Sequence, residues 1–136
     1  MKYANILAAI LAVTGFIISY HIYMSKRRNT KLVCIIGRDC DRVVKSKYSK
    51  ILGTPNEVWG MIYYAGIFFL VFALACFPFL ATPVVLALFK IASSLAALSA
   101  VILFLIQAFV LKEWCEWCLG ADLINILIFI LAIFYF

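Results

Sequence analysis

Two pairs of cysteines are the residues of this sequence whose type and spacing suit redox chemistry. Cys115 and Cys118 form a C-x-x-C pair in the stretch KEWCEWCLGADL, and Cys34 and Cys40 form a C-x5-C pair. The C-x-x-C spacing places both sulfurs on one turn, close enough to bridge. A long apolar run follows, so this pair lies at the start of a helix, where the positive end of the helix dipole favours a thiolate. We interpret both pairs as candidate thiol–disulfide exchange sites.

Simpler interpretations of the cysteines stay open. An inert disulfide between Cys115 and Cys118, with Trp114 and Trp117 as membrane-interface anchors, explains the same residues. In an active pair, the two tryptophans would instead help to form a pocket for a flat ring. Zinc is disfavoured, because structural zinc sites usually combine two close-spaced pairs and C-x5-C is wider. Cys76 lies in an apolar run and is expected to be a small apolar filler.

The composition predicts an integral membrane protein. The chain has 136 residues, is 68% hydrophobic and has a mean hydropathy of +1.13. A soluble fold of this size cannot bury so much apolar surface, whereas about 20 apolar residues in a helix span a bilayer. Four segments qualify, at about 4–24, 58–80, 91–111 and 118–136. The first is too long for the apolar region of a signal peptide. We expect one domain over 1–136, an all-α bundle of four transmembrane helices.

Counting these helices places all four paired cysteines on one membrane face. The cysteine loop, residues 25–57, follows the first helix, and two further crossings, joined by a linker at about 81–90, return the chain to the same face. Cys34 and Cys40 therefore share a face with Cys115 and Cys118, and the two pairs can exchange disulfides. A soluble dithiol protein is then a candidate electron donor, and a quinone dissolved in the lipid is a candidate acceptor.

A short amphipathic helix is expected inside the cysteine loop. Four residues form one apolar stripe at helical spacing: Val44, Tyr48, Ile51 and Leu52. Gly53 is a suitable stop for this helix. The helix would lie on the membrane surface over the bundle. The alternative is a solvated basic loop with an incidental stripe.

Three motifs of this sequence resemble the vitamin K epoxide reductase family. The loop carries C-x5-C-D-x-V-x-x-S-x-Y-S over residues 34–49, the start of the second helix carries G-x-P-N-x-x-W-G-x-x-Y-Y over 53–64, and W-C-x-W-C spans 114–118. The order, the spacing and the four-helix layout are similar to that family over nearly the whole chain. The short loop looks more like that of microbial relatives.

The resemblance implies a quinone-dependent thiol–disulfide oxidoreductase that generates disulfides in other proteins. It implies that Cys34 takes electrons from the substrate and that Cys40 attacks the disulfide between Cys115 and Cys118. Cys118 then lies beside the quinone, which is of the ubiquinone or menaquinone type. Many bacterial relatives carry a fused thioredoxin-like domain. Because this chain ends at Phe136, we expect a separate thioredoxin-like partner.

The resemblance also implies residues that bind the quinone. Ser46 corresponds to a family serine near the active site, and Asn56 falls where some relatives hydrogen-bond the quinone oxygen. Trp59, Tyr63 and Tyr64 are candidate walls of the quinone pocket.

Asp122, one turn after Cys118, departs from the family pattern, because vertebrate members carry tyrosine there. A carboxylate is costly inside a membrane, so we expect a functional role. Proton relay to the reduced quinone and interaction with the helix N-terminus both stay open. The missing tyrosine also weakens the case for the alternative activity, reduction of vitamin K quinone or epoxide. The other rivals are a structural subunit and a small transporter, which would need a charge deeper in the bundle.

Charge and family resemblance disagree about the compartment that the cysteines face. Ten of the 12 Lys and Arg residues lie on the cysteine face, and only Lys2 and Lys90 lie on the other. The positive-inside rule places the cysteine face in the cytoplasm, whereas the family usually keeps its cysteines outside. In the second orientation, the basic loop would bind an acidic partner or anionic headgroups. Labelling of Lys45 by an impermeant reagent on intact cells would exclude the first orientation.

Overall fold

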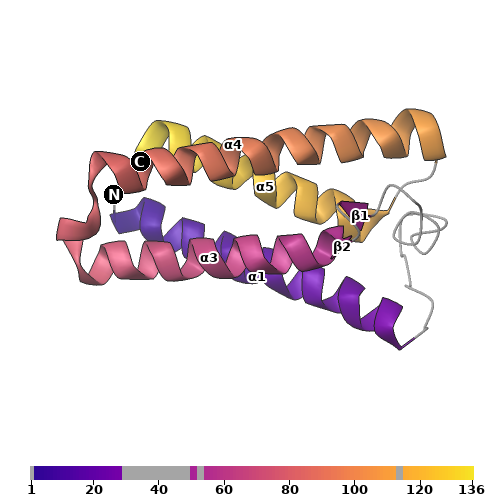
Figure 1. Ribbon diagram of the computed structural model, residues 1–136, viewed down its shortest axis with the longest axis horizontal. Helices are drawn as coiled ribbons and strands as arrows, with labels where there is room; N and C mark the ends of the chain where they lie inside the picture. The colour runs from indigo at the N-terminus through magenta and orange to yellow at the C-terminus, as the bar shows by residue number, and fades with distance from the viewer. Residues whose placement is uncertain (1, 29–49, 52–53, 113–114) are drawn as a thin grey trace.

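The computed structural model describes residues 2–28, 50–51, 54–112 and 115–136, which form a bundle of four long helices (Figure 1). The helices are α1 (Lys2–Arg27), α3 (Asn56–Cys76), α4 (Pro83–Leu105) and α5 (Glu116–Tyr135). The shorter elements are a strand β1 (Lys50–Ile51), a strand β2 (Thr54–Pro55), a 3-10 helix η2 (Pro78–Leu80) and a π-helical segment η3 (Ile106–Leu111). All four long helices have the length and hydropathy needed to cross a membrane. The predicted all-α membrane bundle is therefore confirmed.

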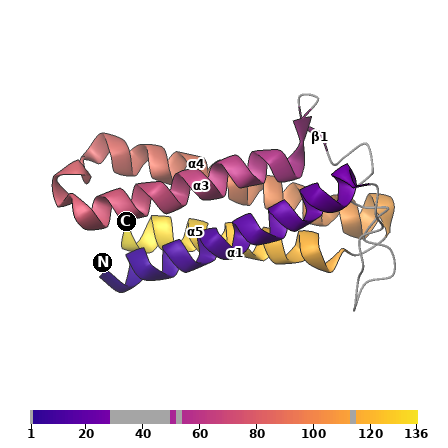
Figure 2. The same ribbon diagram turned by 90° about the horizontal axis from the view of Figure 1, so that it is seen from below.

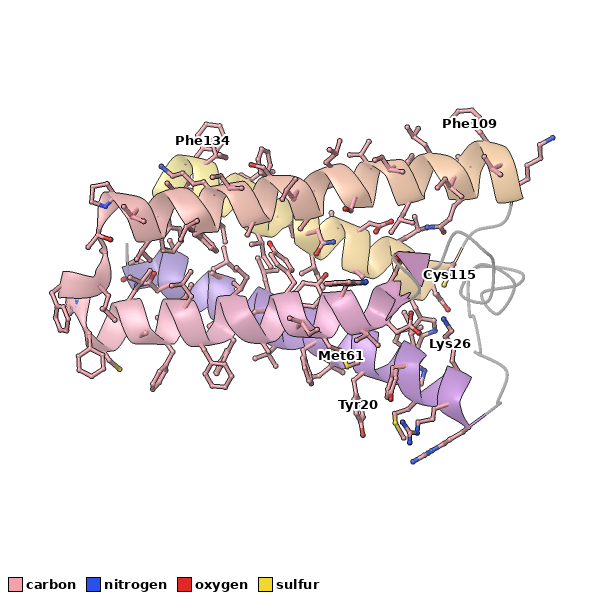
Figure 3. All side chains as sticks on the ribbon, in the orientation of Figure 1. Tyr20, Lys26, Met61, Phe109, Cys115 and Phe134 are labelled. Atoms are coloured by element: carbon pink, nitrogen blue, oxygen red, sulfur yellow. The ribbon has the colours of Figure 1, made fainter. Side chains whose placement is uncertain are left out.

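The long helices lie side by side along the longest axis of the molecule (Figures 1 and 2). α1 packs against both α3 and α5, and α4 packs against α5. The two chain termini lie at one end of the bundle. The opposite end, called the redox end below, holds the last turn of α1, the β1–β2 hairpin and the starts of α3 and α5 (Figure 3). The helix count had predicted that these segments share one face.

The core of the bundle is narrow, because many large apolar side chains point outward. Outward-facing residues such as Phe69, Leu95 and Phe109 are more than half exposed, as suits a surface in contact with lipid. The buried cluster joins all four helices through Ala8, Ala12, Tyr64, Ile67, Val71, Phe89, Ile124, Ile128, Leu131 and Ala132. The alanines of α1 are small, so its neighbours can approach its backbone closely.

The connection between α3 and α4 is shorter than the expected linker over 81–90. α4 begins at Pro83, where a proline fits the first helical position because no partner is needed for its nitrogen. Thr82 caps the helix, and its side-chain oxygen accepts the Val85 N–H at 3.3 Å. Lys90 therefore lies inside α4, where its long side chain can extend toward the headgroups. α3 ends at Cys76, earlier than expected, because Pro78 cannot continue an α-helix.

The end of the expected amphipathic helix is a strand in this structure. Ile51 belongs to β1 and pairs with Thr54 in a two-stranded antiparallel hairpin. Both side chains are β-branched, and a residue before proline, here Thr54 before Pro55, favours extended backbone. The other residues of that predicted helix, 44–49 and 52, lie outside the described residues.

A close contact between α1 and α3 depends on Gly15. A Cβ atom added at Gly15 would lie 2.6 Å from Cε1 and Cζ of Tyr64. The Tyr64 ring is buried, and its hydroxyl donates to the Ala121 carbonyl at 3.2 Å and to the Asn125 side-chain oxygen. Tyr64 thereby joins α3 to α5 while lying against α1, and its ring has little freedom to move away.

Gly15→Ala is expected to lower the free energy of unfolding by about 1–3 kcal/mol, because the new methyl group overpacks the Tyr64 ring. Gly66→Ala is the matched control, since a Cβ at Gly66 meets no atom within 4 Å. Unfolding in mixed detergent micelles measures both variants. An equal loss of stability in the two variants would show that Tyr64 does not pack as described.

Candidate redox site

Cys115 lies at the redox end, directly before α5, and caps that helix. Its backbone is extended, with φ −114° and ψ 111°, and its sulfur accepts the Cys118 N–H at 3.4 Å. Cys115 is fully buried, and both it and Cys118 are free thiols. The structure thus places the predicted C-x-x-C pair at a helix N-terminus, with Cys115 as the sulfur that receives the hydrogen bond.

The surroundings of Cys115 lower the pKa of its thiol. The largest cause is a hydrogen bond from the Cys118 thiol, and the backbone N–H groups of Cys118 and Trp117 lower the pKa further. Burial and the negative charge of Glu116 act in the opposite direction without outweighing these hydrogen bonds. A thiolate is the attacking species in disulfide exchange, so Cys115 is suited to be the nucleophile of the pair.

In the reduced protein, Cys115 is expected to ionise at a lower pH than an ordinary thiol. Because the folded-state pKa is lowered, the thiolate persists at pH values between the lowered and the ordinary pKa, and it is lost only below the lowered value. Ultraviolet thiolate absorbance, taken as the difference between the protein and Cys115→Ala, measures this titration. Cys118→Ala removes the largest cause and should move the midpoint upward. A wild-type midpoint at or above the ordinary value would contradict the hydrogen-bonded geometry.

Gln107 is a residue of the site that sequence reasoning missed. It lies in η3 and is 2% exposed, and its side-chain oxygen accepts the backbone N–H of Cys115 at 3.1 Å. Its side-chain nitrogen is buried with no hydrogen-bond partner among the described residues. The available signal was a single amide in the apolar run LFLIQAFVL, residues 103–111.

A second missed feature is an ion pair that joins α1 to α3. Lys26 Nζ lies 2.9 Å from Glu57 Oε1, and the Glu57 side chain is only 4% exposed. Lys26 is in the last turn of α1 and Glu57 in the first turn of α3, so each charge also suits its helix end. Glu57 and Asp122 both lie close enough to Cys118 to interact with it electrostatically. The Lys26–Glu57 ion pair therefore joins α1 to α3 beside the C-x-x-C motif.

Lys26→Met is expected to destabilise the protein by roughly 3–5 kcal/mol, because it leaves the buried Glu57 without its counter-charge. The double variant Lys26→Met with Glu57→Leu should recover most of that loss, because no unpaired charge remains. Unfolding in mixed micelles of both single variants and the double variant gives the coupling free energy. Strictly additive effects would show that the two charges do not interact.

Asp122 lies on the inner side of α5, one turn after Cys118. It is 7% exposed, and its Oδ2 atom has no hydrogen-bond partner among the described residues. The hydroxyl of Tyr63 is likewise buried, with no partner in the described part of the chain. Both groups are therefore available to a ligand or a proton.

The structure places the other predicted quinone residues along the first turns of α3. Asn56 and Trp59 lie at the redox end, and Tyr63 and Tyr64 follow within two further turns. An apolar groove of about 460 Å³ lies between α3 and α4. Its lining residues are Ile62, Tyr63, Gly66, Ile67, Leu70, Val85, Leu88, Phe89 and Ala92. Tyr63 thus lines a hollow, whereas the Tyr64 hydroxyl is engaged with α5.

Trp117, between the two cysteines, contacts α1. Its ring lies 4.5 Å from that of His21, centroid to centroid, with the planes tilted by 41°. This contact ties the start of α5 to α1 beside Cys118. Of the remaining predicted site residues, Cys34, Cys40 and Ser46 lie outside the described part of the chain.

The residues present fit a quinone. The groove between α3 and α4 is almost entirely apolar, as a lipid-soluble tail requires. Tyr63 lines this groove, and its buried hydroxyl, which has no hydrogen-bond partner among the described residues, could supply a polar contact to a quinone head.

A protein-family model described as the Vitamin K epoxide reductase family matches residues 6–133. The match runs from the second turn of α1 nearly to the end of α5, so it includes every described residue of the candidate site.

Proposed function

The chain belongs to the vitamin K epoxide reductase family, and on that premise we propose a specific electron path. Members of this family are membrane oxidoreductases that act on quinones or disulfides, and the four apolar helices make this chain a multi-pass membrane protein. Electrons pass from a separate thioredoxin-like dithiol to Cys34 and Cys40, then to Cys115 and Cys118, and then to a quinone of the ubiquinone or menaquinone type. The partner leaves with a new disulfide. The observation that carries this proposal is the buried Cys115 sulfur on the N-terminus of α5, hydrogen-bonded by Cys118.

Each exchange step conserves thiols and disulfides. The partner dithiol reduces the Cys34–Cys40 disulfide and becomes oxidised. The Cys40 thiolate then attacks Cys115 in the Cys115–Cys118 disulfide, and Cys118 leaves as a thiol. Cys34 next attacks Cys40 and releases Cys115, whose lowered pKa makes it a good leaving group. The product is a reduced Cys115–Cys118 pair beside the membrane interior.

The second half of the reaction oxidises this pair again. A bound quinone supplies an acceptor for two electrons and two protons. Cys115, as the thiolate, and Cys118, as the thiol, would re-form the disulfide and give up two electrons and the Cys118 proton. Tyr63 and the groove between α3 and α4 would hold the acceptor, and Asp122, which interacts electrostatically with Cys118, would supply the second proton.

Purified protein in nanodiscs tests the proposal. A reduced thioredoxin-like protein is the donor, and ubiquinone and menaquinone analogues are the acceptors. Quinol absorbance should rise only when protein, donor and quinone are all present, with one partner disulfide formed per quinol. The proposal fails if no quinone analogue is reduced while the same sample is folded and all its thiols are free.

A further inference from the structure

The hydrogen bond from Cys115 to Gln107 links η3 to the C-x-x-C pair. The Gln107 side-chain oxygen accepts the Cys115 N–H at 3.1 Å, across eight residues of chain. Both residues are buried, Gln107 at 2% exposure and Cys115 fully. A backbone N–H is a donor only, so the atom of the amide that meets it must be the oxygen.

The backbone around Gln107 is irregular in a way that aims its side chain. Residues Ile106–Leu111 form a π-helical turn rather than a continuation of α4, and such turns recur at functional sites. Lys112, directly after this turn, has a left-handed backbone with φ 53°. Cys115, which follows this segment in the sequence, is buried, and the Gln107 side chain reaches its backbone N–H.

This one bond fixes the backbone on one side of Cys115, while α5 fixes its sulfur on the other. The sulfur accepts the Cys118 N–H at 3.4 Å, a bond that requires the extended Cys115 backbone to stay in place. Loss of the Gln107 oxygen would leave the buried N–H of Cys115 without its partner. Cys115 could then shift away from the N-terminus of α5.

A purely structural role explains Gln107 less well. Burying an amide in a membrane helix is costly unless its groups are paired. The Gln107 nitrogen has no partner among the described residues, so the amide is only half satisfied. A leucine would fill the same space in the run LFLIQAFVL at no such cost. In the described part of the chain, the Gln107 side chain is bonded to the backbone of Cys115, a cysteine of the C-x-x-C pair.

We propose that Gln107 is a positioning residue for the redox pair, whose side-chain oxygen holds Cys115 so that its sulfur sits on the N-terminus of α5 and is ready for disulfide exchange. The inference rests on the proposed role of Cys115 in exchange. It assigns the π-helical turn a purpose, which is to bring the Gln107 amide to the cysteine that precedes α5.

Two variants and one matched control test this role. Gln107→Met keeps the volume of the side chain but removes the acceptor, and Gln107→Asn keeps the amide but shortens it by one methylene. Ser93→Ala is the control, since Ser93 is fully buried in the preceding helix α4 and its hydroxyl donates to the Lys90 carbonyl, with no contact to the cysteines among the described residues. The readouts are the thiolate titration of Cys115 in the reduced protein, the quinone-dependent turnover and the melting temperature.

Both Gln107 variants should raise the midpoint of the Cys115 titration and lower its thiolate fraction at neutral pH by about three- to tenfold. Turnover should fall by roughly 10- to 100-fold, because the sulfur is misplaced. The groups whose charge bears on this titration are Cys118 and Glu116, and Asp122 and Glu57 act on Cys118; none of them is altered. Ser93→Ala should leave the midpoint unchanged.

The titration separates this inference from the proposed function, because it needs neither quinone nor partner. A raised midpoint in a protein that reduces no quinone would keep the positioning role and reject the electron acceptor. An unchanged midpoint in either folded Gln107 variant, with a melting temperature lowered as in Ser93→Ala, would overturn the positioning role. Two different replacements are used so that at least one folded variant is available.

Discussion

A variant with alanine at Cys118 is expected to lose quinone-dependent oxidation of its dithiol partner, by roughly a thousandfold or more. In the proposed path, Cys118 is the sulfur that Cys115 attacks when the pair is oxidised again, so no disulfide can form without it. The structure supports this division of roles, because Cys115 is the hydrogen-bonded sulfur with the lowered pKa. Cys115→Ala should be equally inactive. The rate of quinol formation in nanodiscs measures both variants.

The same Cys118→Ala variant should also accumulate a disulfide between Cys40 and Cys115. In that protein the Cys115 thiolate attacks an oxidised Cys34–Cys40 pair, Cys34 leaves as a thiol, and Cys118 is absent to resolve the product. Mass spectrometry of peptides after acid quenching identifies the linkage. Cys76→Ala is the control, because Cys76 lies at the end of α3 far from the redox end, and it should keep full activity. Full turnover in Cys118→Ala would reject the relay.

Asp122→Asn is expected to slow quinone reduction by about 100-fold, if Asp122 delivers a proton as proposed. Asparagine has nearly the same shape but cannot donate a carboxyl proton. The carboxyl group is buried on α5 close to Cys118, and its Oδ2 atom has no partner among the described residues. Single-turnover quinone reduction by the pre-reduced protein measures the step directly.

Two comparisons make the Asp122 result specific. Asp122→Glu keeps a carboxyl group and should retain much more activity than the asparagine variant. Reduction of the Cys115–Cys118 disulfide by the partner involves no quinone, so it should proceed at an unchanged rate in Asp122→Asn. If the asparagine variant reduces quinone as fast as the parent protein, Asp122 has only the alternative role of interacting with the N-terminus of α5.

The general architecture was predictable because membrane spanning is a matter of length and hydropathy. Four apolar runs gave four helices, and the parity of the crossings placed Cys115 at the same end as the last turn of α1 and the first of α3. The C-x-x-C spacing before an apolar run likewise predicted a helix N-terminus at the cysteines. The start of α4 was missed, because the predicted linker at about 81–90 contained Pro83, whereas Thr82 caps the helix and Pro83 is its first residue.

The missed site residues depend on which helix faces meet, and one sequence does not show that. Gln107 reaches Cys115 from the π-helical segment η3, which is followed by Lys112 in a left-handed backbone conformation. Glu57 is buried only because the end of α1 brings Lys26 beside it. In the sequence, Gln107 is a single amide inside an apolar run, and Glu57 is an acidic residue directly before another apolar run. Their significance follows from packing.

The most direct measurement of the proposed path is a single anaerobic turnover of the fully reduced protein with one equivalent of quinone. Differential alkylation and mass spectrometry then report which thiols have been lost at each time. We expect Cys115 and Cys118 to become a disulfide first, with one disulfide formed per quinol, and the Cys34–Cys40 pair to be oxidised afterwards. Quinol formation with the Cys115 and Cys118 thiols intact, or with Cys34 and Cys40 oxidised first, would contradict it.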